Sequence, residues 1–243
     1  MTTIALHLQQ VQARITRACA QAGRPAGSVA LLAVSKTFGA DAVLRAAEAG
    51  QRAFGENYIQ EGVGKMAELR VRAPALAPAL AWHCIGPIQS NKTRLVAENF
   101  DWAQTLDRLR IAERLSEQRP AHLPPLQVCI QVNVDAGASK SGVAPGEALA
   151  LAHAVARLPR LRLRGVMGIP DPVAGFDAQR ALHLRVRAVF DAIAASRAPG
   201  LESLDTVSLG MTADLEAAIA AGSTLVRVGS GIFGARDGAP GPA

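Results

Sequence analysis

Residues 29–36 read VALLAVSK, and residues 41–50 read DAVLRAAEAG. The first stretch is a near-continuous apolar run, which is typical of a strand covered on both faces in a parallel sheet. The second stretch has the pattern of a short helix, with Asp41 in its first turn and Gly50 as a stop signal. Together they predict one β-α unit, and a chain built from such units favours an α/β fold.

The same alternation continues along the chain. Further strands are expected at 52–57, 80–86, 101–107, 126–134, 161–169, 205–211 and 224–230. Helices are expected between them at 58–70, 90–98, 108–119, 146–157, 177–196 and 212–221, with a loop at 71–80. With residues 29–36 this makes eight units of about 27 residues each. Eight β-α units in a chain of this length predict a single closed (β/α)8 TIM barrel.

Two segments lie outside the repeat. Apolar residues from Ile4 to Cys19 recur at helical spacing, so we expect an extra N-terminal helix. No long linker divides residues 1–236, which predicts one barrel domain, and residues 237–243 (DGAPGPA) predict a flexible tail. An open doubly wound sheet is the alternative fold, but no GxGxxG or GxxxxGK(S/T) motif follows any predicted strand.

The composition excludes several classes of protein. The chain has 243 residues, of which 49% are apolar and 19% charged, as in an ordinary globular domain. No apolar run is long enough to span a membrane, and the start of the chain does not resemble a signal peptide. Cys19, Cys84 and Cys129 lie far apart, which argues against a disulfide framework or a metal site. We therefore expect a cytoplasmic protein without a metal or a membrane partner.

The net charge of +6 raises the question of nucleic-acid binding. The basic residues are spread along the chain, however, and two Trp, one Tyr and six Phe are too few for a base-stacking surface. A small anionic ligand or a solvated surface fits this charge as well, and we expect no nucleic-acid partner. Only four of the 26 basic residues are lysines, namely Lys36, Lys65, Lys92 and Lys140.

In a TIM barrel the functional groups lie at the C-terminal ends of the strands. The seventh predicted strand ends in SLGMT (208–212) and the eighth in GSG (229–231), whose glycines let backbone N–H groups approach a phosphate. Lys36 closes the first strand, where a partly desolvated amine can act as a nucleophile. An amine that faces a phosphate site favours a phosphorylated aldehyde held as a Schiff base, and pyridoxal 5′-phosphate (PLP) has both groups.

Other residues allow two interpretations. Arg227 lies in an apolar strand, so it either points into the mouth toward a pyridine nitrogen or pairs with a carboxylate at the rim. Thr212 is alternatively the N-cap of the next helix, and Lys36 a solvated strand end. His83, next to Trp82, is more typical of a hydrogen-bonded core histidine, and it is a secondary candidate for the site.

Six motifs resemble the pyridoxal phosphate homeostasis proteins. They span about residues 30–236 in order, and each alone would be weak evidence. They are AVSKTF (33–38), FGENYIQE (54–61), WHCIGPIQSNK (82–92), ASKSG (138–142), LGMTADLEAAI (209–219) and STLVRVGSGIFGAR (223–236). The family is similar to the barrel domain of alanine racemase, the fold type III group of PLP proteins.

The resemblance implies a role for each matching residue. Lys36 would form the Schiff base with PLP, Asn57 would lie beside the ring, and Arg227 would face the pyridine nitrogen. Lys140 matches a family lysine near the mouth and is a secondary candidate. The phosphate would be held by Ser208, Gly210, Met211, Thr212, Gly229 and Ser230.

The resemblance also bears on catalysis. Alanine racemase uses the PLP lysine and an opposed tyrosine from a second domain, whereas here only about a dozen residues follow the last strand and the single tyrosine is Tyr58. We therefore expect a monomeric, non-enzymatic protein that buffers or delivers PLP within the cell, with transient contacts to PLP-dependent apoenzymes. The alternatives are a weak PLP-dependent racemase or decarboxylase and a phosphate-binding isomerase barrel without PLP.

Overall fold

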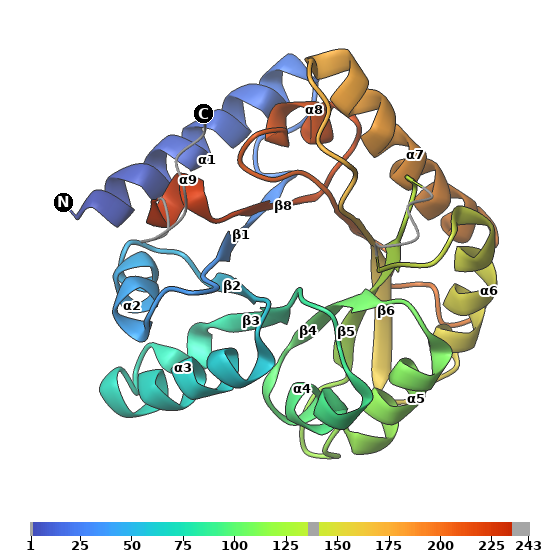
Figure 1. Cartoon of the computed structure of the whole chain (residues 1–243), viewed down its shortest axis with the longest axis horizontal. Coiled ribbons are helices and arrows are strands. Elements are labelled where there is room, and N and C mark those ends of the chain that lie inside the picture. Colours follow the sequence, from blue (N-terminus) through green and yellow to red (C-terminus); the bar gives the residue numbers. More distant parts are fainter. Residues whose placement is uncertain (1, 136–140, 235–243) are drawn as a thin grey trace.

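A computed structural model of the chain describes residues 2–135 and 141–234 and shows a closed barrel of eight parallel strands in chain order (Figure 1). The strands are β1 (Ala30–Val34), β2 (Ala53–Glu56), β3 (Ala81–Cys84), β4 (Trp102–Leu106), β5 (Leu126–Val132), β6 (Leu161–Gly168), β7 (Thr206–Ser208) and β8 (Leu225–Val228). β8 pairs with β1 and closes the ring. The predicted TIM barrel is confirmed, with all eight strands in the expected places.

Helices surround the barrel in the order that the sequence predicts (Figure 1). They are α1 (Thr3–Gln21), α2 (Ala40–Glu48), α3 (Ile59–Arg72), α4 (Thr93–Asn99), α5 (Leu109–Gln118), α6 (Pro145–Ala156), α7 (Phe176–Ala195), α8 (Leu215–Ala220) and α9 (Ser230–Phe233). The extra N-terminal helix α1 is confirmed, and it packs against α8 and α9. Arg14 of α1 forms an ion pair with Glu216 at 2.9 Å and donates to the carbonyl of Thr212 at 3.0 Å.

Four details differ from the sequence prediction. The short helix α9 follows β8, where no helix was expected. The expected loop at 71–80 contains a short 3-10 helix, η1 (Ala77–Ala79), and a second one, η2 (Ser90–Lys92), precedes α4. The helix expected from residue 212 begins at Leu215 with Asp214 as its N-cap. The interpretation of Thr212 as an N-cap is therefore wrong, and residues 209–214 form an irregular segment and a turn between β7 and α8.

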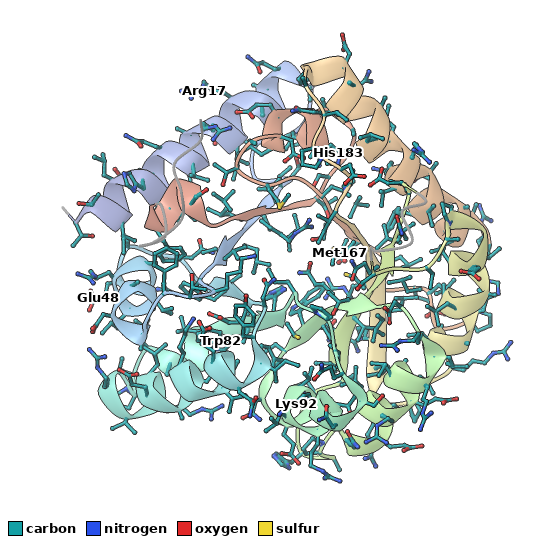
Figure 2. All side chains as sticks on the ribbon, in the orientation of Figure 1. Arg17, Glu48, Trp82, Lys92, Met167 and His183 are labelled. Atoms are coloured by element: carbon teal, nitrogen blue, oxygen red, sulfur yellow. The ribbon has the colours of Figure 1, made fainter. Side chains whose placement is uncertain are left out.

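The strands bury different side chains on their two faces. The outward face is apolar and packs under the helices, where each large buried side chain contributes about 1.5–3 kcal/mol. Trp82, for example, lies between β3 and α3 (Figure 2). Inside the barrel, a small apolar cluster holds Leu32, Val34, Ile85 and Leu225. The remaining interior positions include polar residues, and these lead to the candidate site.

No helix in the described part of the chain is long and apolar enough to cross a membrane. All three cysteines are free and buried, which agrees with the expected lack of a disulfide framework. Lys140 and the expected tail at 237–243 lie outside the described residues.

Candidate functional site

Lys36 follows the C-terminal end of β1. The strand alternates its side chains, and Lys36 continues the series of Leu32 and Val34, whose side chains fill the barrel interior. The lysine is partly buried, and its neighbour Ser35 is fully buried. β1 ends at Val34, and Lys36 lies in the turn that follows it, so we expect its amine at the barrel mouth by extension of this alternation.

The turn after β8 lies directly beside this segment. An added Cβ at Gly229 would lie 3.2 Å from the carbonyl oxygen of Val34, so only glycine allows this close approach without a shift of β1. Phe38, just beyond Lys36, stacks on Phe233 with ring centroids 5.1 Å apart. The lysine segment and the β8-α9 turn are therefore neighbours, as the hypothesis requires.

The turns after β7 and β8 meet each other. The hydroxyl of Ser230 lies 3.4 Å from that of Thr212. Gly210 has φ +87°, and an added Cβ there would lie 2.5 Å from the Cβ of Ala218, so this turn requires glycine. The two predicted phosphate turns thus form one continuous polar edge next to Lys36.

Met211 is the exception among these residues. Its N–H donates to Asp214 Oδ1 at 2.6 Å, so a carboxylate of the chain itself occupies this amide. Asp214 Oδ2 lies 3.0 Å from Nε2 of the buried His183. Burial alone would raise the pKa of Asp214, but the hydrogen bonds from His183 and the Met211 N–H outweigh it and lower the pKa. No local sequence pattern points to this pair, because His183 lies on α7, about thirty residues before Asp214.

Arg227 lies inside the barrel rather than in an ion pair at the rim. Its Nη1 donates to the carbonyl and the hydroxyl of Ser208 at 2.7 and 2.8 Å, and its Nη2 donates to the carbonyl of Gly168 at 2.8 Å. These bonds use three of the five guanidinium N–H groups, and the other two remain for a ligand. Burial lowers the pKa of Arg227 to about 10, so the side chain still carries its charge at neutral pH.

A series of hydrogen bonds runs from Arg227 to His83, and each residue donates to the next. The Ser208 hydroxyl donates to Gln104 Oε1 at 2.7 Å, and Gln104 Nε2 lies 2.9 Å from His83 Nδ1. Because the Gln104 oxygen already accepts, its amide nitrogen donates to a neutral His83. Burial lowers the pKa of His83 to about 3. We call Arg227, Ser208, Gln104 and His83 the interior polar chain, and His83 is the hydrogen-bonded core histidine that the sequence favoured.

A cluster of charges lies behind β1, between the barrel wall and α3. The buried ammonium of Lys65 donates to Ser35 O at 2.7 Å and to Glu56 Oε1 at 2.8 Å, and it lies 2.6 Å from Glu61 Oε1. The Ser35 hydroxyl donates to the same Glu56 oxygen at 2.6 Å. Burial raises the pKa of Glu56 despite these partners. We call Lys65, Glu56 and Glu61 the rear ion cluster, and no motif in the sequence predicts it.

The residue after Lys36 has an uncommon backbone conformation. Thr37 has φ +68°, which is unfavourable for a β-branched residue and costs roughly 1–3 kcal/mol. Its N–H donates to Glu61 Oε1 at 2.8 Å. Surrounding contacts must hold such a conformation, and one of them comes from the rear ion cluster.

A cavity of about 230 Å³ opens on the side of the mouth away from the phosphate turns, and its wall includes Asn57, Thr105, Gln131 and Ile169. The Oδ1 atom of Asn57 is buried and has no hydrogen-bond partner among the residues that the structure describes. Met167, at the end of β6, points into the barrel interior (Figure 2). The free amide oxygen and the glycine turns fit a ligand with a polar ring and an anionic group. A larger cavity of about 360 Å³ lies around Leu80 and Pro124, before β3 and β5, and contains none of the predicted site residues.

Known proteins of similar sequence and fold define the class of this barrel. The family model for the N-terminal domain of alanine racemase matches residues 6–237. An alanine racemase from Corynebacterium glutamicum shares the fold, with a TM-score of 0.60 at 19% identity over 96% of this chain and 63% of that chain. These matches define the chain as a barrel of the alanine racemase N-terminal type.

More similar proteins narrow the class. The pyridoxal phosphate homeostasis proteins of Pseudomonas aeruginosa and Escherichia coli K12 are 56% and 52% identical to the chain, and the alignments cover 99% and 98% of both partners. PipY of Synechococcus elongatus, solved with PLP bound, has a TM-score of 0.81 at 34% identity and covers 95% of this chain and 100% of its own. The chain belongs to the pyridoxal phosphate homeostasis protein family.

Proposed function

We propose that this chain binds PLP at the C-terminal mouth of its barrel, attached to Lys36 as a Schiff base, and takes part in intracellular PLP homeostasis by buffering or delivering the cofactor. The observation that carries the proposal is the proximity of the Lys36 segment to the two glycine turns, with Gly229 against Val34. PLP supplies an aldehyde on which a lysine amine condenses with loss of water. The PLP-bound structure of PipY supports the same ligand for this chain.

The site residues divide the task. Gly210, Thr212, Gly229 and Ser230 would hold the phosphate, because their backbone and hydroxyl groups meet at one edge. Asn57 would lie beside the ring with its unpaired oxygen. The Met211 amide and the Ser208 hydroxyl already have partners, so we assign these two residues to shaping the turn and supporting Arg227.

Arg227 would direct one of its two remaining N–H groups at the single lone pair of the pyridine nitrogen. A guanidinium donates only, so it would keep that nitrogen unprotonated. The ring would then withdraw electrons weakly, which disfavours carbanion chemistry at an attached amino acid. Arg227 thus supports a binder more than a racemase.

This chain also differs from a racemase at the second catalytic base, which in alanine racemase is a tyrosine opposite the PLP lysine. The single tyrosine, Tyr58, is 57% exposed at the start of α3 and has no place opposite Lys36 on the inner side of the barrel. The curated relatives are named as homeostasis proteins and not as enzymes. Both observations support a non-enzymatic function.

We also propose that the protein is a cytoplasmic monomer that contacts PLP-dependent apoenzymes only transiently. The three free thiols suit a reducing compartment. Sedimentation of the purified protein with and without PLP tests the monomer, and a stable dimer would refute it.

The test uses purified protein with added PLP. We expect a long-wavelength absorbance band and, after borohydride reduction, a PLP adduct on the peptide that contains Lys36. Lys36→Ala should abolish that adduct, whereas Lys92→Ala, which changes a lysine beside α4 outside the barrel, should leave it unchanged (Figure 2). A panel of amino acids should show no turnover above the Lys36→Ala background, and turnover well above it would favour the weak enzyme instead.

A further inference from the structure

The rear ion cluster contacts the residues on both sides of Lys36. On the N-terminal side, Ser35 offers its carbonyl to Lys65 at 2.7 Å and its hydroxyl to Glu56 at 2.6 Å. On the C-terminal side, the N–H of Thr37 donates to Glu61 at 2.8 Å. The backbone that carries Lys36 is therefore fixed at two points.

Lys65 joins the two anchor points. An ammonium group has three N–H donors, and here Ser35 O, Glu56 and Glu61 lie 2.7, 2.8 and 2.6 Å from the nitrogen. The side chain is 6% exposed, so water screens these contacts little. No other lysine in the described part of the chain is as buried among carboxylates. In a chain with few lysines, this full coordination indicates a specific arrangement.

The helix approaches the strands closely at this position. Gly62 of α3 lies against Glu56, where an added Cβ would be 3.2 Å from its Cβ and Cγ. The missing side chain lets α3 bring Lys65 and Glu61 onto the end of β1. The cluster lies on the outer side of the barrel wall, because Ser35 and Glu56 both bond to Lys65 of the surrounding helix α3.

We propose that Lys65 is a positioning residue for Lys36. Through Ser35 on one side and Glu61 with Thr37 on the other, it holds the left-handed turn that presents the Lys36 amine to PLP from behind the barrel wall. This inference rests on the proposed function and adds a residue that does not itself touch the cofactor.

The experiment compares Lys65→Met with Arg119→Met. Arg119 is a matched control, because it is equally buried and donates to the carbonyls of Pro124, Ala97 and Phe100, before β5 at the other end of the barrel. Both variants should lose thermal stability. Only Lys65→Met should weaken PLP binding, by about tenfold or more, and slow the formation of the borohydride-trapped Lys36 adduct to a similar extent. Lys65→Arg keeps a cation with several donors and should restore part of the affinity and of the absorbance band.

A milder variant keeps the test decisive if Lys65→Met does not fold. Glu61→Ala removes the acceptor of the Thr37 N–H at a half-buried helix position, and its control is Glu48→Ala, which changes an exposed side chain of α2 (Figure 2). We expect Glu61→Ala to weaken PLP binding by about threefold or more and Glu48→Ala to leave it unchanged.

The outcomes separate the two proposals. If folded Lys65→Met, or Glu61→Ala in its place, binds PLP and forms the adduct like its control, Lys65 has only a structural function and this inference fails. If the unmodified protein forms no Lys36 adduct at all, the proposed function fails first.

Discussion

The end of β1 and the ends of β7 and β8 meet at one edge of the barrel mouth, yet the chain holds them by different means. Behind β1, two carboxylates and one ammonium fix the backbone around Lys36 from outside the wall. At β7 and β8, glycine turns and the interior polar chain shape the edge from inside. Outer ion pairs hold the reactive amine without occupying the mouth, whereas the inner edge keeps donors that a ligand can use.

The largest effect should come from the interior polar chain. Arg227→Met removes the donor to Ser208 and Gly168 and leaves buried carbonyls unpaired, so we expect a loss of about 3–5 kcal/mol in the free energy of unfolding. PLP binding should weaken as well. Urea unfolding measures the first effect, with Arg94→Met, which changes an exposed side chain of α4, as the control. A loss below about 1 kcal/mol would show that the interior polar chain does not hold the inner edge.

The second test uses pH. His83 has a pKa of about 3 in the folded protein against an ordinary value of 6.5, so the unfolded chain binds the extra proton as the pH falls below 6.5. The free energy of unfolding is therefore unaffected by His83 above pH 6.5 and falls progressively toward pH 3. The loss is about 3 kcal/mol near pH 4. His83→Gln cannot take up that proton and should show a flatter acid limb in urea unfolding. Equal acid sensitivity in both proteins would contradict a neutral, buried His83.

A smaller effect is expected at the β7-α8 turn. Gly210→Ala combines a positive φ with a contact of 2.5 Å to Ala218, so we expect a loss of about 2–3 kcal/mol and weaker PLP binding. Gly23→Ala has a positive φ but no neighbour within 4 Å, and it should cost about 1 kcal/mol with unchanged binding. Thermal melts and PLP titration compare the two, and equal losses would mean that the turn is not tightly packed.

The smallest effects compare two glycines on α3. Gly64→Ala meets no neighbour and should stabilise the helix by about 0.5–1 kcal/mol. Gly62→Ala gains the same propensity but presses on Phe100 and Glu56, so we expect no gain or a loss of about 1 kcal/mol. Thermal melts measure the difference, and a gain at both positions would show that the rear ion cluster tolerates a wider spacing.

The features of the fold and the site that depend on local sequence pattern were predictable from the sequence. Eight apolar strands, their helices and the glycines of 208–212 and 229–231 follow from spacing and composition, and the structure places them as expected. The sequence could not predict which strand face each polar residue takes. In the sequence, Glu56 is the polar end of a predicted strand and Lys65 lies in the predicted helix after it, and only the fold brings both side chains onto Ser35. His183 and Asp214 meet for the same reason.

The most direct test of the account is the mass spectrum of the PLP-loaded, borohydride-reduced protein after proteolysis. The account predicts one reduced PLP group on the peptide that contains Lys36, and none on the same peptide from Lys36→Ala. A protein that takes up no PLP, or that carries it on other lysines with Lys36 unmodified, would contradict it.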